Sequence, residues 1–310
     1  MMRNATAMLM AILAWNTWMP LPVSTAQTGT PRTAPVQRGA AANPQARVAT
    51  ARQTTPPAAA PFQLSRDEQS HLDAILVAWE KQSGATTTLE STFHRYHYDT
   101  TGAPAGIYAS AALGTIKYAK PDKGLFKVEQ KIFYKGMKDG KPEHGPIEGQ
   151  YGEHWVCNGR ELIEFDRSQK ECRIQTLPEQ LQGEGIINSP LPFVFNLRAD
   201  DIKQRYWVRQ VTAPKAGLIM IEAWPKRQED AAQYKLVQIV LHEDSFLPAG
   251  LVMYAPNYDD RTAPHRDIYE FTNATRNGQM QKLKNFWNNF IPEKPPSDWK
   301  IHRNDFVPGQ

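Results

Sequence analysis

The residues best suited to chemistry in this chain are histidines and carboxylates that stand close together in the sequence. His94 and His97 could share a metal ion, but a spacing of three places them on opposite faces of an extended strand. Glu143-His144 and Glu153-His154 could pair for acid–base work, yet each pair lies in or beside a loop, and we interpret both as solvated surface residues. We therefore predict neither a metal site nor a catalytic pair.

Motifs of the common enzyme classes are absent from the sequence. It contains no Gly-x-Ser-x-Gly elbow, no phosphate-binding glycine loop, no dinucleotide fingerprint and no His-Glu-x-x-His. The acidic residues at 179–184 and at Glu229-Asp230 have the composition of solvated turns. We predict a protein that is not an enzyme and that has no cofactor; an enzyme using scattered carboxylates is the least favoured alternative.

Cys157 and Cys172 are the only cysteines. They fit an oxidising compartment, where a disulfide can persist. Simple hairpin pairing, however, places Cys172 opposite about Phe165 and Cys157 opposite residues 160–162, so the two are not direct partners in that register. A bulge could bring them together. The sequence leaves a disulfide and two small buried thiols equally open.

The first 26 residues have the pattern of a secretory signal. Arg3 gives the N-terminus a positive charge, and the apolar run from Ala7 to Trp15 is too short for a permanent transmembrane helix. Ser24-Thr25-Ala26 supplies the small residues that precede a cleavage site after Ala26. An uncleaved anchor is the alternative. We expect a periplasmic or otherwise exported protein.

Residues 27–61 predict a disordered tether, because they contain no aromatic or acidic residue and are rich in proline, alanine and threonine. Contact of their arginines with anionic lipid or cell wall is the alternative to a solvated spacer. The four arginines of the tether and Arg3 contribute +5 to the net charge of +4, so the remainder carries only −1 and no nucleic-acid partner is expected.

An amphipathic helix opens the region 62–310, which we predict to be a single domain. Ser65 and Glu68 form a capping-box pattern, and Gly84 ends the helix. One apolar stripe follows at helical spacing between them: Leu72, Ile75, Leu76 and Trp79.

The pattern of most of the remaining chain predicts strands, because turn residues recur every 8–16 positions. Asn158-Gly159 is a strong signal for a tight turn. This spacing favours an antiparallel sheet built from hairpins. Residues 135–153 predict a long connection, and 190–197 and 199–204 predict short helices. The predicted strands are 89–98, 107–118, 125–134, 155–157, 161–165, 172–177, 206–212, 217–224, 234–241, 250–255 and 266–273.

Several strands are apolar on both faces, as at 218–221 and 237–241. A sheet of this kind is covered on both faces or lines a hollow. A curved sheet wrapped round helices fits the pattern better than a flat one.

Blocks of these strands resemble the periplasmic outer-membrane lipoprotein carrier (LolA-like) superfamily, in the order of that family. The blocks are Gly-Thr-Ile-Lys-Tyr-Ala-Lys-Pro-Asp-Lys-Gly-Leu-Phe-Lys-Val at 114–128, Val-Cys-Asn-Gly-Arg-Glu-Leu-Ile-Glu-Phe-Asp at 156–166, Ser-Pro-Leu-Pro-Phe-Val-Phe at 189–195, Glu-Ala-Trp-Pro-Lys at 222–226, and Phe-Ile-Pro…Trp-Lys-Ile at 290–301. The amino-acid sequence of the longer segments 177–186 and 254–259 is similar to that of an uncharacterised family of exported proteins known chiefly from planctomycetes.

The resemblance implies a mainly β, α+β fold: a strongly curved antiparallel half-barrel with helices covering the concave side. In the carrier, the hollow holds acyl chains. The resemblance thus implies a carrier or chaperone-like binding protein for a lipid or an acylated protein, with an envelope protein as a further partner and peripheral contact with a membrane. The main alternative is a cell-envelope scaffold whose barrel is filled by its own side chains and takes no ligand.

An acyl chain gains about 0.8 kcal/mol for each CH₂ group removed from water, so a carrier needs an apolar concavity with a removable lid. Lys120 aligns with the family's lid-latching arginine but lacks its planar fork. The residues that we predict to bind ligand are Lys120, Leu72, Ile75, Leu76, Trp79 and Phe126.

Overall fold

The computed structural model describes residues 60–177, 198–279 and 284–304. The predicted signal peptide, nearly all of the predicted tether and the predicted helix at 190–197 lie outside these residues. Within the described ranges, no helix is both long enough and apolar enough to cross a bilayer.

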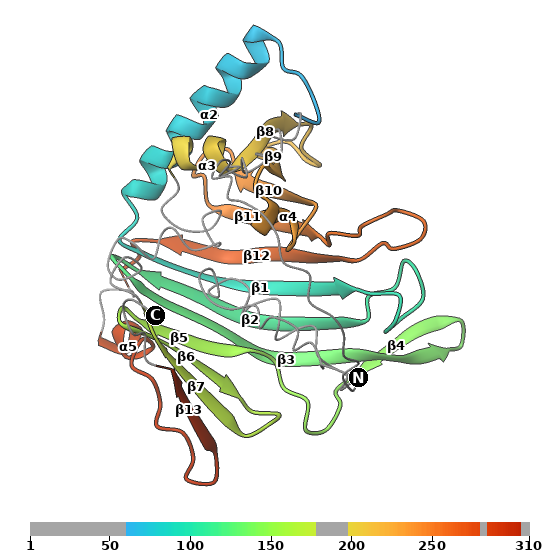
Figure 1. Cartoon of the computed structure of the whole chain (residues 1–310), viewed down its shortest axis with the longest axis vertical. Helices are drawn as coiled ribbons and strands as arrows, with labels where there is room; N and C mark the ends of the chain where they lie inside the picture. The colour runs from blue at the N-terminus through green and yellow to red at the C-terminus, as the bar shows by residue number, and fades with distance from the viewer. Residues whose placement is uncertain (1–59, 178–197, 280–283, 305–310) are drawn as a thin grey trace, which may run out of the picture.

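One open sheet dominates the molecule (Figure 1). Its order is β13-β7-β6-β5-β3-β2-β1-β12-β11-β10-β9-β8, and β4 pairs with β3 off this path. All pairs are antiparallel except β13 with β7. The strands are β1 (Thr88–Tyr98), β2 (Ser110–Ala119), β3 (Lys123–Lys138), β4 (Lys141–Gly145), β5 (His154–Asn158), β6 (Glu161–Asp166), β7 (Glu171–Thr176), β8 (Tyr206–Val211), β9 (Leu218–Pro225), β10 (Leu236–His242), β11 (Pro248–Tyr254), β12 (Arg266–Arg276) and β13 (Lys300–Asn304). The predicted antiparallel half-barrel of hairpins is confirmed.

The register divides the residues of the sheet between two faces, because side chains alternate along a strand and direct cross-strand partners share a face. Phe93 pairs with Phe271 of β12, and Ile116 of β2 pairs with Phe126 of β3. We call the face that carries these side chains the inner face and the opposite one the outer face.

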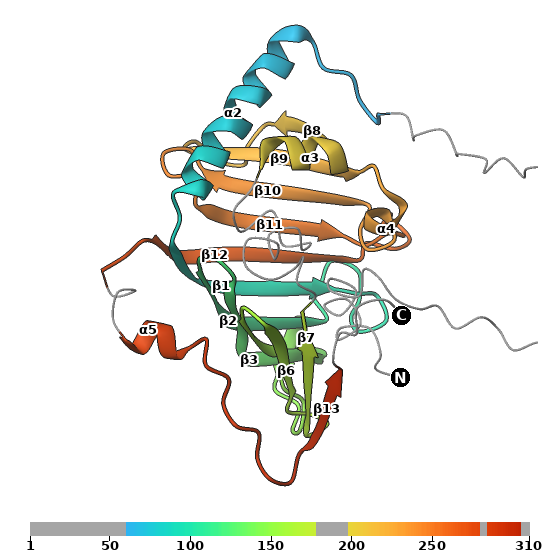
Figure 2. The ribbon, with the colours of Figure 1, turned by 60° about the vertical axis from the view of Figure 1, so that its left-hand side comes forward.

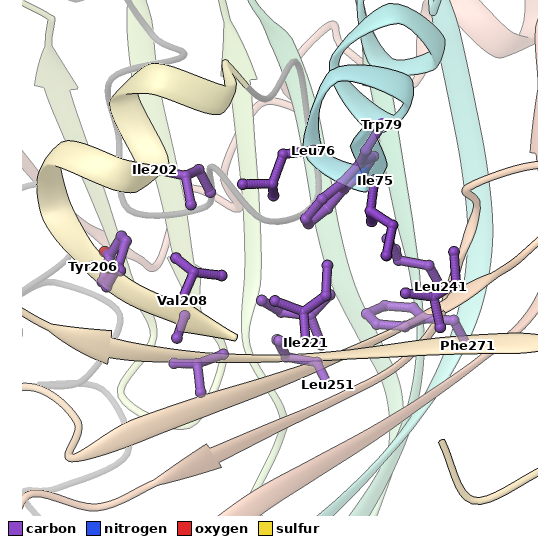
Figure 3. Packing of buried hydrophobic residues seen from close by; sticks show 14 of the residues in the cluster. Ile75, Leu76, Trp79, Ile202, Tyr206, Val208, Ile221, Leu241, Leu251 and Phe271 are labelled. Carbon is purple, nitrogen blue, oxygen red and sulfur yellow. The ribbon is translucent and has the colours of Figure 1, made fainter. Parts of the chain in front are cut away.

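Helix α2 (Arg66–Gly84) covers part of the inner face. The predicted capping box is present, since Ser65 Oγ accepts from the Glu68 amide and the Glu68 carboxylate accepts from the Ser65 amide. The helix lies beside β8 and the short helix α3 (Ala199–Arg205) (Figures 1 and 2). Figure 3 shows Ile75, Leu76 and Trp79 pointing toward strand residues such as Ile221, so the predicted apolar stripe is the buried face of this helix.

Helix α5 (Lys284–Asn288) lies beside β5 and β6 and packs on the outer face (Figure 1). Phe286 and Phe290 join a second apolar cluster with Leu125 and Val156, which face away from the inner-face residue Phe126. Helices therefore cover both faces of the sheet, although only the concave side was predicted to be covered.

Three further features differ from the sequence predictions. The connection at 135–153 contains the end of β3 and all of β4, which form a hairpin with Asp139 and Gly140 at positive φ. Strand β13 was not predicted, because its five side chains are exposed and show no alternation. A short helix α4 (Gln228–Ala231) replaces the predicted solvated turn, and its Asp230 is fully buried against Arg205.

Candidate ligand-binding face

A strip of aromatic rings crosses the inner face from β5 to β12, perpendicular to the strands. Phe93 stacks on Phe126 at 4.7 Å between ring centroids, and Phe126 stacks on Trp155 at 5.2 Å. On the other side, Phe93 lies 5.7 Å from Tyr269, which stacks at 6.2 Å on Phe271. The strip is a continuous apolar surface on four strands.

The structure brings most of the predicted ligand-binding residues into one cluster. Phe126 lies in the aromatic strip, and the four helical residues of the stripe reach the same core from α2. All five are buried: Leu72, Ile75, Leu76, Trp79 and Phe126.

Lys120 stands apart from this cluster, at the end of β2. Its amide donates to the Thr87 carbonyl at 2.8 Å, and so joins β2 to the linker between α2 and β1. Its ammonium makes no hydrogen bond or ion pair with any residue that the structure describes. Lys120 is thus placed beside the linker between α2 and β1, while a latching contact stays a prediction.

Polar groups gather on the inner face toward the C-terminal end of β1, away from that linker. Arg95 Nη2 donates to Glu153 Oε2 at 2.8 Å, with only 9% and 12% of the two side chains exposed. Burial alone would raise the pKa of Glu153, but the Arg95 charge and hydrogen bond, with Lys131, lower it to about 2. The prediction of a solvated Glu153 is wrong because the loop before β5 turns this carboxylate inward to meet a buried cation.

Lys131, which lies on β3, belongs to the same polar group. It lies in register with Ala112 of β2, which in turn lies in register with Arg95, so all three share the inner face. Burial lowers the pKa of Lys131, and the attraction of Glu153 only partly offsets this. Within the described residues, its ammonium has no acceptor in hydrogen-bond range.

His97 and Asp267 complete the polar group. Their Nδ1 and Oδ1 atoms lie 2.8 Å apart, and this hydrogen bond raises the pKa of His97. His94 lies exposed on the opposite face of β1, as the spacing predicts. No three histidine, cysteine or acidic side chains in the described parts of the chain are placed to hold a metal ion.

Trp155 carries a further polar atom on this face. Its Nε1 is buried and has no hydrogen-bond partner in the described structure. Arg95 has a second hydrogen-bond partner besides Glu153, because its Nη1 donates to the Tyr269 hydroxyl at 3.4 Å. Trp155 is in register with Phe126, so its unpaired donor belongs to the aromatic strip and not to the polar end.

The cysteines lie in strands that are not neighbours. Cys157 of β5 pairs with Leu162 and Cys172 of β7 pairs with Phe165, as the hairpin register predicts. Both are buried free thiols, which is the second of the two alternatives left open by the sequence. Burial raises the pKa of Cys157 to about 11, so this thiol is not activated as a nucleophile.

A surface recess at the start of α2 does not belong to the inner face. It is formed by one short segment of chain and contains no aromatic residue. Its lining residues are Leu64, Ser65, Arg66, Gln69, Ser70 and Asp73.

Sequence reasoning missed the polar end. Arg95 and His97 occupy the same alternating positions of β1 as the buried Phe93. A basic side chain at an inward-facing position of a strand was the signal that could have revealed the polar end. Glu153 gave no signal, because only the path of the loop brings it to Arg95.

Comparison with known proteins gives matches among solved structures alone. No family model matches the sequence, and no curated protein matches it. An uncharacterised conserved protein from Thermus thermophilus is 9% identical, with 76% of this chain and 99% of that chain covered and a TM-score of 0.41. A putative outer membrane lipoprotein-sorting protein domain from Vibrio parahaemolyticus is 11% identical, with 71% and 97% covered and a TM-score of 0.30. A LolA superfamily protein from Nitrosomonas europaea is 11% identical, with 69% and 97% covered and a TM-score of 0.29. Members of the superfamily that the sequence blocks resemble are thus among the solved structures that this chain matches.

Proposed function

We propose that this protein is an exported binding protein for the acyl chain of a lipid or lipoprotein, and that it acts as a carrier or chaperone-like factor. The observation that carries the proposal is the aromatic strip from Trp155 through Phe126 and Phe93 to Tyr269 and Phe271. It offers an extended acyl chain a continuous apolar track, bordered along one side by charged groups. An acyl chain needs both an apolar lining and a place for its polar head.

The attachment of α2 supports its assignment as a lid. The linker from Ala85 to Thr87 is fixed at both ends by Asn277, which accepts from the Thr87 amide at 2.8 Å and donates to the Ala85 carbonyl at 2.8 Å. Beyond this point, the helix packs on the sheet through apolar side chains, and two polar contacts join it to α3: Glu80 accepts from the Ala199 amide at 3.1 Å and Asp73 accepts from Lys203 at 3.2 Å. Apolar contacts are not directional, so a helix with a fixed end can swing away from the sheet once these two polar contacts break.

A self-filled scaffold is the second candidate, and one observation favours it. Phe93 and Val128 of the inner face are 0% exposed, and Leu76 of α2 is 1% exposed. In a scaffold these side chains are a permanent core. In a carrier they are the closed state, which opens when the helix leaves the sheet.

Uptake of the neutral fluorophore N-phenyl-1-naphthylamine separates the two candidates. The carrier takes it up saturably, and dodecanol displaces it. Leu76→Ala should speed uptake because it weakens the lid, whereas Val77→Ala, at a neighbouring position with a 61% exposed side chain, should leave the rate unchanged. A well-folded protein that never takes up the dye would support the scaffold.

A further inference from the structure

The outer face of the central strands carries a row of apolar side chains that no helix among the described residues covers. Helices α2 and α3 pack on the inner face, and α5 lies beside β5 and β6 (Figures 1 and 2). We call this row, which crosses five neighbouring strands in register, the outer row. Its members are Val252, Ile268, Tyr96, Ala111 and Ile132.

The composition of the outer row points to a contact with another surface. An antiparallel sheet that leaves one face to solvent normally carries polar side chains on that face. The five members of the row are instead apolar or aromatic, and each is half-buried rather than covered. A contiguous apolar patch of this kind on a folded chain marks an interaction site.

Side chains of opposite charge flank the outer row on β12. Arg266 lies two residues before Ile268 and Glu270 lies two residues after it, so all three share the outer face. The Arg266 guanidinium lies 4.3 Å from the centre of the Tyr98 ring and donates to the Pro264 carbonyl at 3.2 Å. Within the described structure, neither Arg266 nor Glu270 forms an ion pair. The patch therefore presents a cation and an anion at equal sequence spacing from its centre.

This arrangement of charge is complementary to itself. If two copies meet face to face about a two-fold axis that crosses the strands, Arg266 of each copy lies opposite Glu270 of the other, and the two Ile268 side chains meet at the centre. A two-fold axis along the strands would instead place like charges opposite each other. The charges of β12 thus select a single orientation for a second copy.

We infer that two copies of this chain pack their outer faces together through the outer row, with two reciprocal contacts between Arg266 and Glu270. Sheets that pack face to face bring their inward side chains together over about 10 Å. The outer face is the convex side of the half-barrel, so the copies touch along its crest, at β1 and β12 in the middle of the sheet order. A contact of this limited size predicts a weak dimer, with a dissociation constant on the order of 10 μM.

This dimer leaves the inner faces free. Because the copies join through their convex sides, the two α2 helices and the two aromatic strips point away from each other. Opening of α2 in one copy therefore meets no obstacle from the other. The inference goes beyond the proposed function and does not require that the inner face binds a lipid.

Charge reversal tests the inference by sedimentation equilibrium of the purified protein over a series of concentrations. Glu270→Arg and Arg266→Glu each replace two attractive contacts by two like-charge contacts. Each variant should weaken dimerisation about a hundredfold, which is about tenfold for each contact. An equimolar mixture of the two variants restores both attractive contacts, so it should form heterodimers about as tightly as the wild type forms its dimer.

Two further variants make the test specific to the outer row. Ile268→Asp places two carboxylates together at the two-fold axis and should yield a monomer, without altering Arg266 and its packing on Tyr98. Glu243→Arg makes the same charge reversal at an exposed position after β10 and should dimerise like the wild type. Circular dichroism and thermal unfolding establish that each variant is folded.

Three results would overturn the inference. They are a wild type that stays monomeric throughout the series, folded Glu270→Arg or Ile268→Asp variants that dimerise like the wild type, and a mixture of the two charge variants that stays monomeric. Each of these results leaves the acyl-binding proposal standing, because uptake of the dye at the inner face is measured separately.

Discussion

Arg95 and Glu153 form a buried ion pair of 2.8 Å that ties β1 to the residue directly before β5, across the two intervening strands β2 and β3. Arg95 is in register with Ala112 of β2, and Glu153 lies beside β3, where its carbonyl accepts from the Val128 amide at 2.8 Å. The ion pair therefore fixes the path of the loop that leads into β5.

Removing one partner of this pair should destabilise the fold. Glu153→Gln leaves the Arg95 charge without a counter-ion, and we expect a loss of about 3 kcal/mol in the free energy of unfolding, measured with urea at pH 7. The double variant Arg95→Met with Glu153→Met removes both charges and should recover most of the loss. A double variant as unstable as the sum of its single variants would show that the pair does not act as a unit.

Truncation of Trp79 should have a large effect, because its ring is 4% exposed within the main core. We expect Trp79→Ala to lower the free energy of unfolding by about 3–5 kcal/mol. Val77→Ala, on the exposed side of the same helix, should stay within about 0.5 kcal/mol. Equal effects of the two substitutions in chemical denaturation would mean that α2 does not pack on the sheet in solution.

His154 should make the protein less stable in mild acid. Burial, with the charges of Lys127 and Arg167, lowers its pKa from 6.5 to about 4. Because the folded pKa lies below the unfolded one, the unfolded chain binds the proton more tightly. The stabilisation is complete above pH 6.5 and is lost as the pH falls toward 4.

The loss from this single group at pH 5 should be on the order of 2 kcal/mol relative to pH 7.5. It is measured as the difference between the pH profiles of the wild type and His154→Gln in urea unfolding. His94→Gln removes an exposed histidine and should follow the wild-type profile. Parallel profiles for the wild type and His154→Gln would mean that this imidazole is solvated.

Lys120 should influence the opening of α2, because its backbone is bonded to the linker that carries the helix. A charge-assisted bond from its ammonium to the lid or to a ligand head would contribute about 1–3 kcal/mol, enough to change dye release by one or two powers of ten. Lys120→Arg should slow release and Lys120→Leu should speed it, as measured by stopped-flow fluorescence. Identical rates in all three proteins would make Lys120 an ordinary surface residue.

The strands and the long helix could be predicted because their signals are local. Ser65 and Glu68 mark the start of α2, and the Asn158-Gly159 turn fixes the hairpin of β5 and β6. The same local logic placed Cys157 and Cys172 in their correct registers.

The polar end could not be predicted in the same way, because it depends on contacts between residues distant in the sequence. Arg95 and Glu153 are 58 positions apart, and Arg95 and Tyr269 are 174 apart. Strand β13 gave no pattern because it is an edge strand whose side chains are exposed on both faces. Local spacing carries no information on which strands become neighbours.

Native mass spectrometry of the protein isolated from its own host tests the central claim most directly. The account predicts a bound species that corresponds in mass to an acyl lipid, which extraction should recover. A folded protein recovered only in its lipid-free mass, under conditions that preserve a known lipid complex, would contradict the account and leave the self-filled scaffold.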